Sequence, residues 1–204
     1  AGGKMDSVDA SKFRVLNMLN TKYFIFPAGQ QGQPVPVENP YAYGNAWFVD
    51  KLDMVENADA EIEALNTIDP LETAVVDKRF QKDLEGFVPQ KDSTATIVLE
   101  EYRPNRLIYK SKTDKEQLAV FSEVYYQPGW KATIDGKEVP HFRADWILRG
   151  MRVPAGEHTI VFEFRPSGYV TAAYVSSYSS FLILLLLIAA IAWSGWKYWK
   201  KSKE

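Results

Sequence analysis

A long stretch without charge near the C-terminus constrains this chain more than any other sequence feature. No Asp, Glu, Lys or Arg occurs between Pro166 and Trp196, and residues 181–193 are all apolar. A helix that crosses the hydrocarbon core of a bilayer needs about 20 predominantly apolar residues, and residues 174–196 supply 23. The sequence therefore predicts a transmembrane helix over 174–196. The alternative, a buried core helix, fits the short strictly apolar run but not its position and flanks.

Aromatic and basic residues at the end of the predicted span indicate its orientation. Lysines directly outside a span mark the cytoplasmic side, and Trp and Tyr are enriched at membrane interfaces. We therefore expect residues 197–204 to form a basic cytoplasmic tail, and residues 1–173 to be periplasmic or extracellular, anchored in the cytoplasmic membrane. The expected membrane-interface residues are Trp193, Trp196, Lys197, Tyr198, Trp199, Lys200 and Lys201.

The part that precedes the span is acidic and contains no cysteine. Residues 1–173 hold 20 Lys and Arg against 25 Asp and Glu, a formal charge of −5, so nucleic acid is not expected as a partner. The lack of cysteine excludes disulfides, thiolate catalysis and zinc–thiolate sites. The chain opens without Met and without an export signal, so we expect further membrane segments upstream of Ala1.

Two patterns divide the part before the span. Residues 1–92 are expected to form a small α+β subdomain, with short helices at 11–20 and after the capping residue Asn57. In the second helix Ile62 and Leu65 are expected to face inward. Strands are predicted at 23–26, 46–52 and 71–76, a helical turn at 80–84, and an irregular loop, rich in Pro and Gly, over 27–45.

Residues 93–168 carry short extended runs separated by turn signals, which predicts an antiparallel, β-sandwich-like subdomain. Asp135-Gly136 favours a hairpin because both residues tolerate positive φ. The fold class is thus α+β leading into a mainly antiparallel β-sandwich, followed by one C-terminal transmembrane helix. The predicted strands are 94–102, 106–112, 117–126, 130–134, 146–153 and 158–165.

Three segments in this order carry a family resemblance: LNMLNTKY at 16–23, GNAWFV at 44–49, and YYQPGWKA at 125–132, which runs into Asp135-Gly136-Lys137. They resemble the C-terminal portion of YfhO-type bacterial membrane proteins, and the likeness covers most of residues 12–180. The resemblance implies an upstream bundle of transmembrane helices in the same polypeptide. It also implies a likeness to polytopic glycosyltransferases that take sugars from polyprenyl-phosphate donors to modify cell-surface polymers. The acidic base expected in such enzymes lies in an early loop that nothing here matches, so the resemblance assigns no catalytic residue.

The sequence offers little to an enzyme that works by itself. The two histidines, His141 and His158, are too few and too far apart for a zinc site and are expected on strand surfaces. No serine-nucleophile elbow and no phosphate-binding loop occurs, so no cofactor is expected. Glu100-Glu101 and Glu123 could in principle form a glycosidase pair, but solvated strand positions explain them more simply.

One cluster mixes aromatic rings with polar groups, as a sugar-binding surface does, where rings cover the apolar face of a pyranose and polar groups bind its hydroxyls. The alternative is that some members belong to the core and the others are exposed. Strand geometry would place Trp146 and Leu148 on one face, and Ile147 and Arg149 on the other. The candidate sugar-contact residues are Tyr126, Trp130, Arg143, Asp145, Trp146 and Arg149.

Three functions fit these observations. The first is a non-catalytic accessory module of a polytopic glycosyltransferase, with the bilayer, the upstream bundle and a surface glycan or polyprenyl-linked sugar as partners. The second is a single-pass membrane-anchored module that binds glycan or protein. The third is a tethered hydrolase that uses carboxylates, which requires a buried acidic pair to converge in a cleft. We favour the first.

Overall fold

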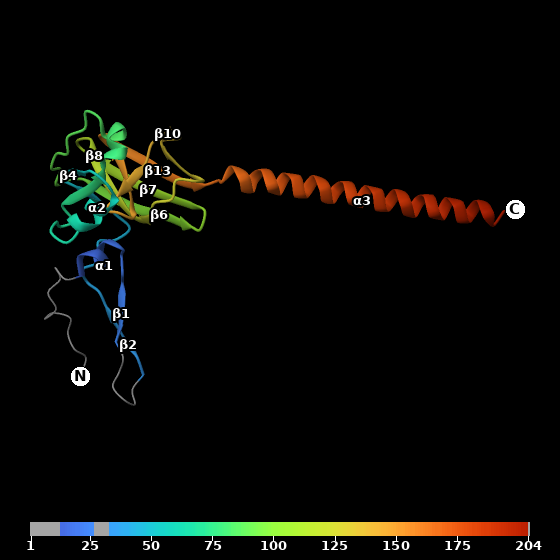
Figure 1. Cartoon of the computed structure of the whole chain (residues 1–204), viewed down its shortest axis with the longest axis horizontal. Helices are drawn as coiled ribbons and strands as arrows, with labels where there is room; N and C mark the ends of the chain where they lie inside the picture. Colours follow the sequence, from blue (N-terminus) through green and yellow to red (C-terminus); the bar gives the residue numbers. More distant parts are fainter. Residues whose placement is uncertain (1–12, 27–32, 204) are drawn as a thin grey trace. The chain divides into compact units, whose positions relative to one another are not determined.

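The computed structural model describes residues 13–26 and 33–203, and the chain divides into two compact units, Ala1–Glu163 (unit 1) and Phe164–Glu204 (unit 2). Unit 1 is mostly antiparallel β-sheet, and unit 2 is one long helix (Figure 1). The predicted fold class is confirmed. The elements before the long helix are α1 (Arg14–Met18), β1 (Tyr23–Phe26), β2 (Val35–Glu38), β3 (Ala46–Val49), β4 (Lys51–Val55), α2 (Ala58–Ala64), β5 (Thr73–Asp77), the 3-10 helix η3 (Lys78–Leu84), β6 (Thr96–Arg103), β7 (Arg106–Thr113), β8 (Gln117–Val124), β9 (Trp130–Ile134), β10 (Lys137–Val139), β11 (Phe142–Ala144), β12 (Leu148–Val153) and β13 (Gly156–Phe164).

Two sheets form a sandwich in unit 1. A five-stranded sheet has the order β10-β9-β13-β7-β6, and a four-stranded sheet has the order β11-β12-β8-β3. Tyr109, Phe121 and Phe162 are fully buried between them and make edge-to-face ring contacts. Such contacts stabilise a core beyond the burial of apolar area alone.

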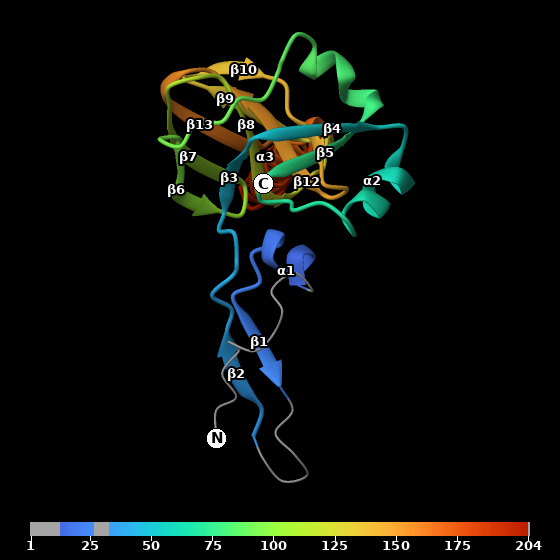
Figure 2. The same ribbon diagram turned by 90° about the vertical axis from the view of Figure 1, so that its left-hand side faces the viewer.

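The four-stranded sheet is covered on both faces. Along β8, Ala119 and Phe121 belong to the sandwich core, whereas Leu118 and Val120 belong to a second core on the other face. Side chains alternate between the faces of a strand, so β8 is a run of apolar residues without the polar alternation of a solvated strand. A third layer, formed by β4, α2 and β5, covers the second core (Figure 2).

This third layer is a βαβ unit, which the sequence analysis did not predict. β4 and β5 are parallel, with Lys51 opposite Thr73 and Val55 opposite Asp77. The strand expected over 46–52 is therefore two strands in two sheets, separated at Asp50. The amide groups of Asp50 and Lys51 both donate to the carbonyl of Glu72, which turns the chain from one sheet into the next.

Helix α2 begins and packs partly as expected. The side chain of Asn57 accepts a hydrogen bond from the amide of Ala60, which confirms the predicted cap. Leu65 is buried as expected, but the inward placement of Ile62 is wrong because its side chain is 39% exposed. Glu61, four residues before Leu65 and on the same helix face, is buried instead.

The expected loop over 27–45 contains a strand. β2 pairs with β1 in an antiparallel ribbon, with Pro36 opposite Ile25. Proline lacks an amide donor but is tolerated in a ribbon of two strands, where each strand has an unpaired edge. Residues 27–32 of the expected loop lie outside the described residues.

The strands of the second half follow the predicted order, with two differences. The short strands β10 and β11 were not predicted, and the strand expected from residue 146 begins only at Leu148. The hairpin at Asp135-Gly136 is confirmed, since both residues have positive φ, +50° and +80°. A boundary between two subdomains is expected at residues 92–93. Strands from both sides of it share one sheet, because β3, which precedes it, pairs with β8, which follows it.

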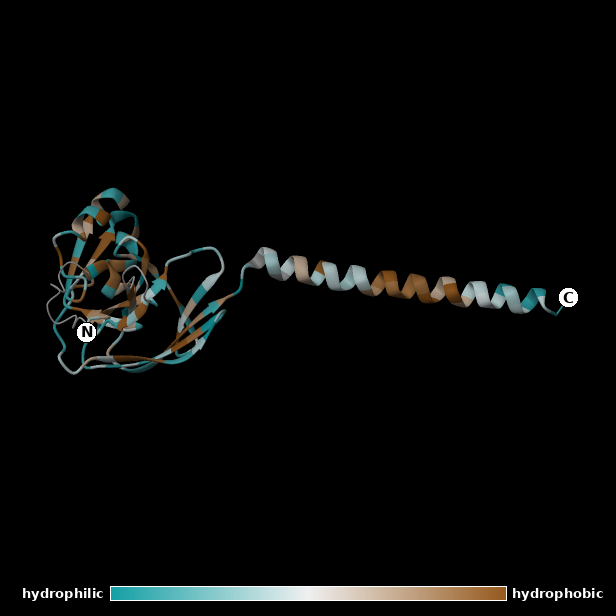
Figure 3. Cartoon of the chain, turned by 90° about the horizontal axis from the view of Figure 1, so that it is seen from below, coloured by the Kyte–Doolittle hydropathy of each residue, from teal (hydrophilic) through white to brown (hydrophobic). Residues whose placement is uncertain are grey.

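Unit 2 is the helix α3 (Ser167–Lys201). Residues 171–201 are long and apolar enough to cross a membrane, and none of the most apolar window is buried. Figure 3 shows the apolar run as the brown middle part of the helix. The expected interface residues between Trp193 and Lys201 all lie in its last turns. There the ring centroids of Trp193 and Trp196 are 6.3 Å apart.

Candidate binding groove around Trp146

The six candidate sugar-contact residues fall into two separate groups. Arg143, on β11, and Asp145 and Trp146, in the connection from β11 to β12, adjoin the third layer of unit 1. Trp130, on β9, and Arg149, on β12, lie at the sandwich core, with Tyr126 in the connection between β8 and β9. Only Trp146 and Tyr126 are exposed, at 42% and 54%.

The first group is organised by a buried carboxylate. Glu61 of α2 has no exposed surface, and one of its oxygens accepts hydrogen bonds from Nη2 and Nε of Arg143, at 2.6 and 3.1 Å. Its other oxygen accepts a bond from the amide of Trp146 at 2.9 Å. Burial raises the pKa of Glu61 above its ordinary value, opposed by the bonds from Arg143 and Trp146. Glu61 thus ties α2 to the segment that carries Trp146.

A second carboxylate holds Arg143 and Arg79 together. Asp77, at the end of β5, pairs with Nη2 of Arg79 at 2.6 Å and lies 3.5 Å from Nη2 of Arg143. Burial acts to raise the pKa of Asp77, but the bonds and the charge of Arg79 outweigh it and lower the pKa. Two arginines therefore neutralise the two acids Glu61 and Asp77.

The third carboxylate, Asp145, is fully buried and joins the β11–β12 connection to β5. Its amide donates to the carbonyl of Val75, and its Oδ1 accepts a bond from the amide of Val75, both at 2.8 Å. Its Oδ2 has no hydrogen-bond partner among the described residues. Burial raises the pKa of Asp145 to about 8, and the charge of Glu61 acts in the same direction. Burial therefore favours the protonated form of Asp145.

These acids do not form the open pair that a hydrolase needs. Glu61 and Asp145 have no exposed surface, and their bonded oxygens are committed to Arg143 and to backbone amides. A sugar cannot reach them in this arrangement. The network instead fixes the backbone around Trp146.

The backbone at this point is a tight turn that presents Trp146 outward. Asp145 and Trp146 both have positive φ, +51° and +68°, a conformation that residues with a side chain rarely adopt. The amide of Ile147 donates to the carbonyl of Asp145 at 2.8 Å and closes the turn. Trp146 is therefore not a strand residue, and its placement on a strand face with Leu148 is wrong. Leu148 and Arg149 do lie on opposite faces of β12, as predicted.

Beside Trp146 lies a groove of about 410 Å³. Its walls come from α1, from α2 with the turn after it, and from the β11–β12 connection, and most of its lining is apolar. Glu63 and Asn66 add the polar groups. Apolar walls with a few placed polar groups are typical of small-molecule sites. The lining residues are Val15, Met18, Leu19, Ile62, Glu63, Leu65, Asn66, Trp146 and Ile147.

The second group surrounds the buried guanidinium of Arg149. Its carbon lies 4.1 Å from the ring centre of Trp130 and 5.2 Å from that of Phe162. Its Nε donates to the carbonyl of Val124 at 3.0 Å. Burial lowers the pKa of Arg149. Trp130 and Arg149 therefore stabilise one end of the sandwich rather than share a surface with Trp146.

The histidines lie apart from each other. His158 on β13 has its Nδ1 2.6 Å from Asp135 Oδ2, and this bond raises the pKa of His158. His141 precedes β11 and is half-buried rather than on a strand, and burial lowers its pKa to about 4. Among the residues that the structure describes, no group of three or more His, Asp or Glu is placed to hold a metal ion.

Comparison with known proteins finds one match. The family model described as "Bacterial membrane protein YfhO" matches residues 79–176, from η3 through all strands of the second half and into α3. No curated protein and no solved structure gives a significant match. Residues 79–176 of this chain are therefore similar to the YfhO family of bacterial membrane proteins.

Proposed function

We propose that this chain is an extracytoplasmic, non-catalytic accessory module of a bacterial integral-membrane glycosyltransferase-like protein. The observation that supports it most is the extent of the family match, which begins in η3, covers β6 to β13 and ends ten residues into α3. The family feature is thus a folded β-rich unit joined to a helix that is able to span a membrane.

The proposed role is to help glycosylate cell-surface polymers from a polyprenyl-phosphate sugar donor, together with an upstream transmembrane bundle of the same polypeptide. The lysines at the end of α3 support a cytoplasmic tail, because basic residues flank spans on that side. Unit 1 then lies on the outer side of the inner membrane, where surface polymers are modified.

Within this module, the groove beside Trp146 is the proposed contact for sugar. The indole ring is exposed on a turn whose backbone Glu61 and Asp145 hold in place before any ligand arrives. A preorganised segment loses little entropy on binding. Glu63 and Asn66, at the same groove, supply a carboxylate and an amide for hydroxyl groups.

The experiment is saturation-transfer difference NMR on the full chain in lipid nanodiscs, with a panel of neutral hexoses and N-acetylhexosamines. We expect transfer to ring C–H protons of at least one sugar, and loss of the transfer in Trp146→Ala. Tyr126→Ala is the matched control, because Tyr126 is an exposed aromatic residue outside the groove. No transfer with the parent chain, or equal transfer with Trp146→Ala, would remove the groove from the proposal.

A second candidate, a membrane-anchored module that binds glycan or protein without serving an enzyme, is favoured by one observation. Among the described residues, those that line the groove include both its apolar walls and its polar groups, Glu63 and Asn66. The two candidates differ in cells. If Trp146→Ala abolishes sugar binding and leaves surface glycosylation unchanged at equal protein level, the second candidate is the better one.

A further inference from the structure

In the five-stranded sheet, the turn between β6 and β7 lies beside the last residues of β13. In the register of β7 with β13, Arg106 is opposite Glu163, and in that of β6 with β7, Arg103 is opposite Arg106. The turn between β6 and β7 therefore lies beside the last residues of β13, at one end of unit 1.

The connection between β8 and β9 lies at the same end. Arg149 donates to the carbonyl of Val124, the last residue of β8, and its guanidinium covers the ring of Trp130, the first residue of β9. The same guanidinium lies over Phe162, close to the end of β13. Arg149 thus fixes both ends of this connection next to the end of β13.

The exposed side chains at this end include aromatic, apolar and basic ones. Tyr102 is 65% exposed, Val124 56% and Tyr126 54%, and Arg103 and Arg106 are exposed as well. Glu101 pairs with Arg103 at 2.5 Å. Tyrosine beside arginine is the composition found where proteins meet lipid headgroups, since the ring tolerates the interface and the guanidinium binds phosphate. We name Tyr102, Arg103, Arg106, Val124 and Tyr126 the tyrosine–arginine rim.

Chain length keeps this rim close to the membrane. Only Arg165 and Pro166 separate β13 from α3, and seven helical residues, Ser167 to Ala173, precede the expected span. At 1.5 Å per residue these seven residues are about 10 Å long. The headgroup layer on one side of a bilayer is roughly 5 to 8 Å thick. The two linker residues add up to about 7 Å when extended. The end of β13 can therefore lie no farther than about 9 to 12 Å from the outer limit of the headgroups.

We propose that the tyrosine–arginine rim contacts the phosphate-bearing headgroup layer of the bilayer that α3 enters. The contact is shallow, because the stem of seven residues keeps the rim out of the hydrocarbon core. The proposal requires a spanning α3 and does not depend on any sugar binding by the Trp146 groove.

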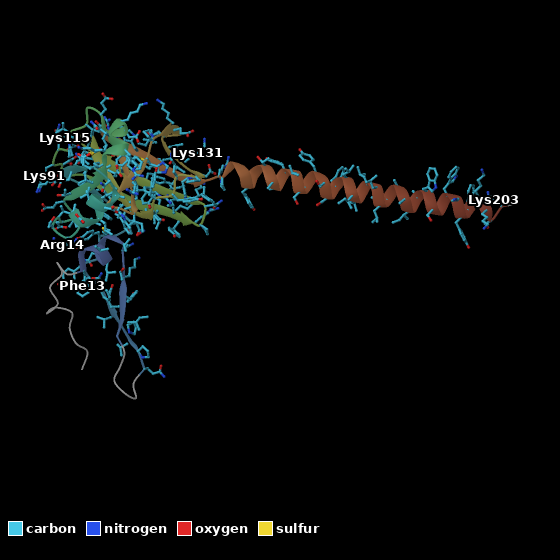
Figure 4. The ribbon with its side chains drawn as sticks, viewed as in Figure 1. Phe13, Arg14, Lys91, Lys115, Lys131 and Lys203 are labelled. Atoms are coloured by element: carbon cyan, nitrogen blue, oxygen red, sulfur yellow. The ribbon has the colours of Figure 1, made fainter. Side chains whose placement is uncertain are left out.

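The test is fluorescence quenching at single cysteines, because the chain has no cysteine of its own. The full chain with Tyr126→Cys carries an environment-sensitive dye in phosphatidylcholine vesicles that contain lipid with a nitroxide on the headgroup. The matched control is Lys115→Cys, exposed in the connection from β7 to β8, at the other end of β7 (Figure 4). Because β7 has eight residues, residue 115 lies about 26 Å from the Arg106 end of this strand.

We expect headgroup nitroxide to quench the dye at residue 126 several-fold more than the dye at residue 115. Nitroxide deep in the acyl chain is expected to quench residue 126 weakly and a dye at Leu186→Cys strongly. Equal quenching at residues 126 and 115 overturns the proposal, and so does an unquenched dye at residue 186. With Arg103 and Arg106 both changed to Gln, quenching at residue 126 falls, and unchanged quenching contradicts the phosphate contact.

Discussion

Glu61 is the residue on which the Trp146 turn most depends, because it binds Arg143 with one oxygen and the amide of Trp146 with the other. Glu61→Ala leaves the guanidinium of Arg143, which is only 18% exposed, without its closest partner. Removal of one member of a buried ion pair typically costs about 3 to 5 kcal/mol. We expect a loss of this order in the free energy of unfolding, measured by urea denaturation of the full chain in detergent micelles.

The matched control is Glu63→Ala, two residues later on the same helix and exposed. Surface substitutions of this kind change stability by about 0.5 kcal/mol or less. If Glu61→Ala and Glu63→Ala have the same small effect, the proposed role of the Glu61 network in holding the turn is wrong.

Asp145 gives the fold a pH dependence of defined sign. Its carboxyl has a pKa of about 8 in the folded protein and an ordinary value of 3.8. Between these two values the folded state holds a proton that the unfolded state releases, so stability from this group falls as the pH rises through that window. The slope is about 1.4 kcal/mol for each pH unit.

Asp145→Asn removes this titration while its side-chain oxygen can still accept the bond from Val75. We expect the stability of the variant relative to the parent to increase from pH 5 to pH 8. The measurement is the midpoint of urea unfolding at each pH, monitored by tryptophan fluorescence. A constant offset between the two proteins over this range would show that Asp145 is ionised in the folded state.

At the scale of elements, the close approach of β11 and β12 depends on Gly150. It pairs with Phe142, and an added Cβ would overlap Cε2 of that ring. Phe142 is 1% exposed and packs against Phe80, so the ring has little room to move. We expect Gly150→Ala to destabilise unit 1 by about 1 to 3 kcal/mol, as overpacked cores do.

Gly168→Ala serves as the comparison, since nothing lies within 4 Å of its added Cβ. Thermal unfolding followed by near-UV circular dichroism measures both variants. A melting temperature of Gly150→Ala equal to that of Gly168→Ala would contradict the packing described for β11 and β12.

The elements that the sequence predicted well carry local signals. Asp135-Gly136 needs only its own backbone preference to form a hairpin, and Asn57 caps α2 with its own side chain. The elements that were missed lack such signals. The parallel pairing of β4 with β5 joins residues that are far apart in sequence, such as Lys51 and Thr73, which periodicity does not report. The strand β11 pairs locally with β12, but its three residues are too few to show an alternating pattern.

At the scale of the whole molecule, the difference between local signals and distant contacts also explains how far the candidate site could be predicted. Composition singled out Trp146, Arg143 and Asp145 as candidates, but period-2 alternation placed Trp146 in a strand. Asp145 and Trp146 both have positive φ, and because neither is a glycine, the sequence carries no sign of the turn. Glu61 was missed because a buried acid on an amphipathic helix looks like a solvated one. Its spacing of four from the buried Leu65 was the one available signal.

The long apolar helix, in contrast, was predictable from composition, because the cost of burying charge in lipid acts on composition alone. The apolar run at residues 181–193 lies in the middle of α3, and the helix continues beyond it in both directions. The orientation of this helix decides whether unit 1 can meet the polymers that the proposed function requires.

Single-cysteine accessibility in spheroplasts tests this orientation directly. Spheroplasts that carry Lys115→Cys, in unit 1, or Lys203→Cys, C-terminal to α3, are treated with a membrane-impermeant maleimide before and after permeabilisation. We predict that Cys at 115 reacts in intact spheroplasts, whereas Cys at 203 reacts only after the membrane is opened. The reverse pattern, or a chain that leaves the membrane fraction without detergent, would contradict an outward-facing unit 1 anchored by α3.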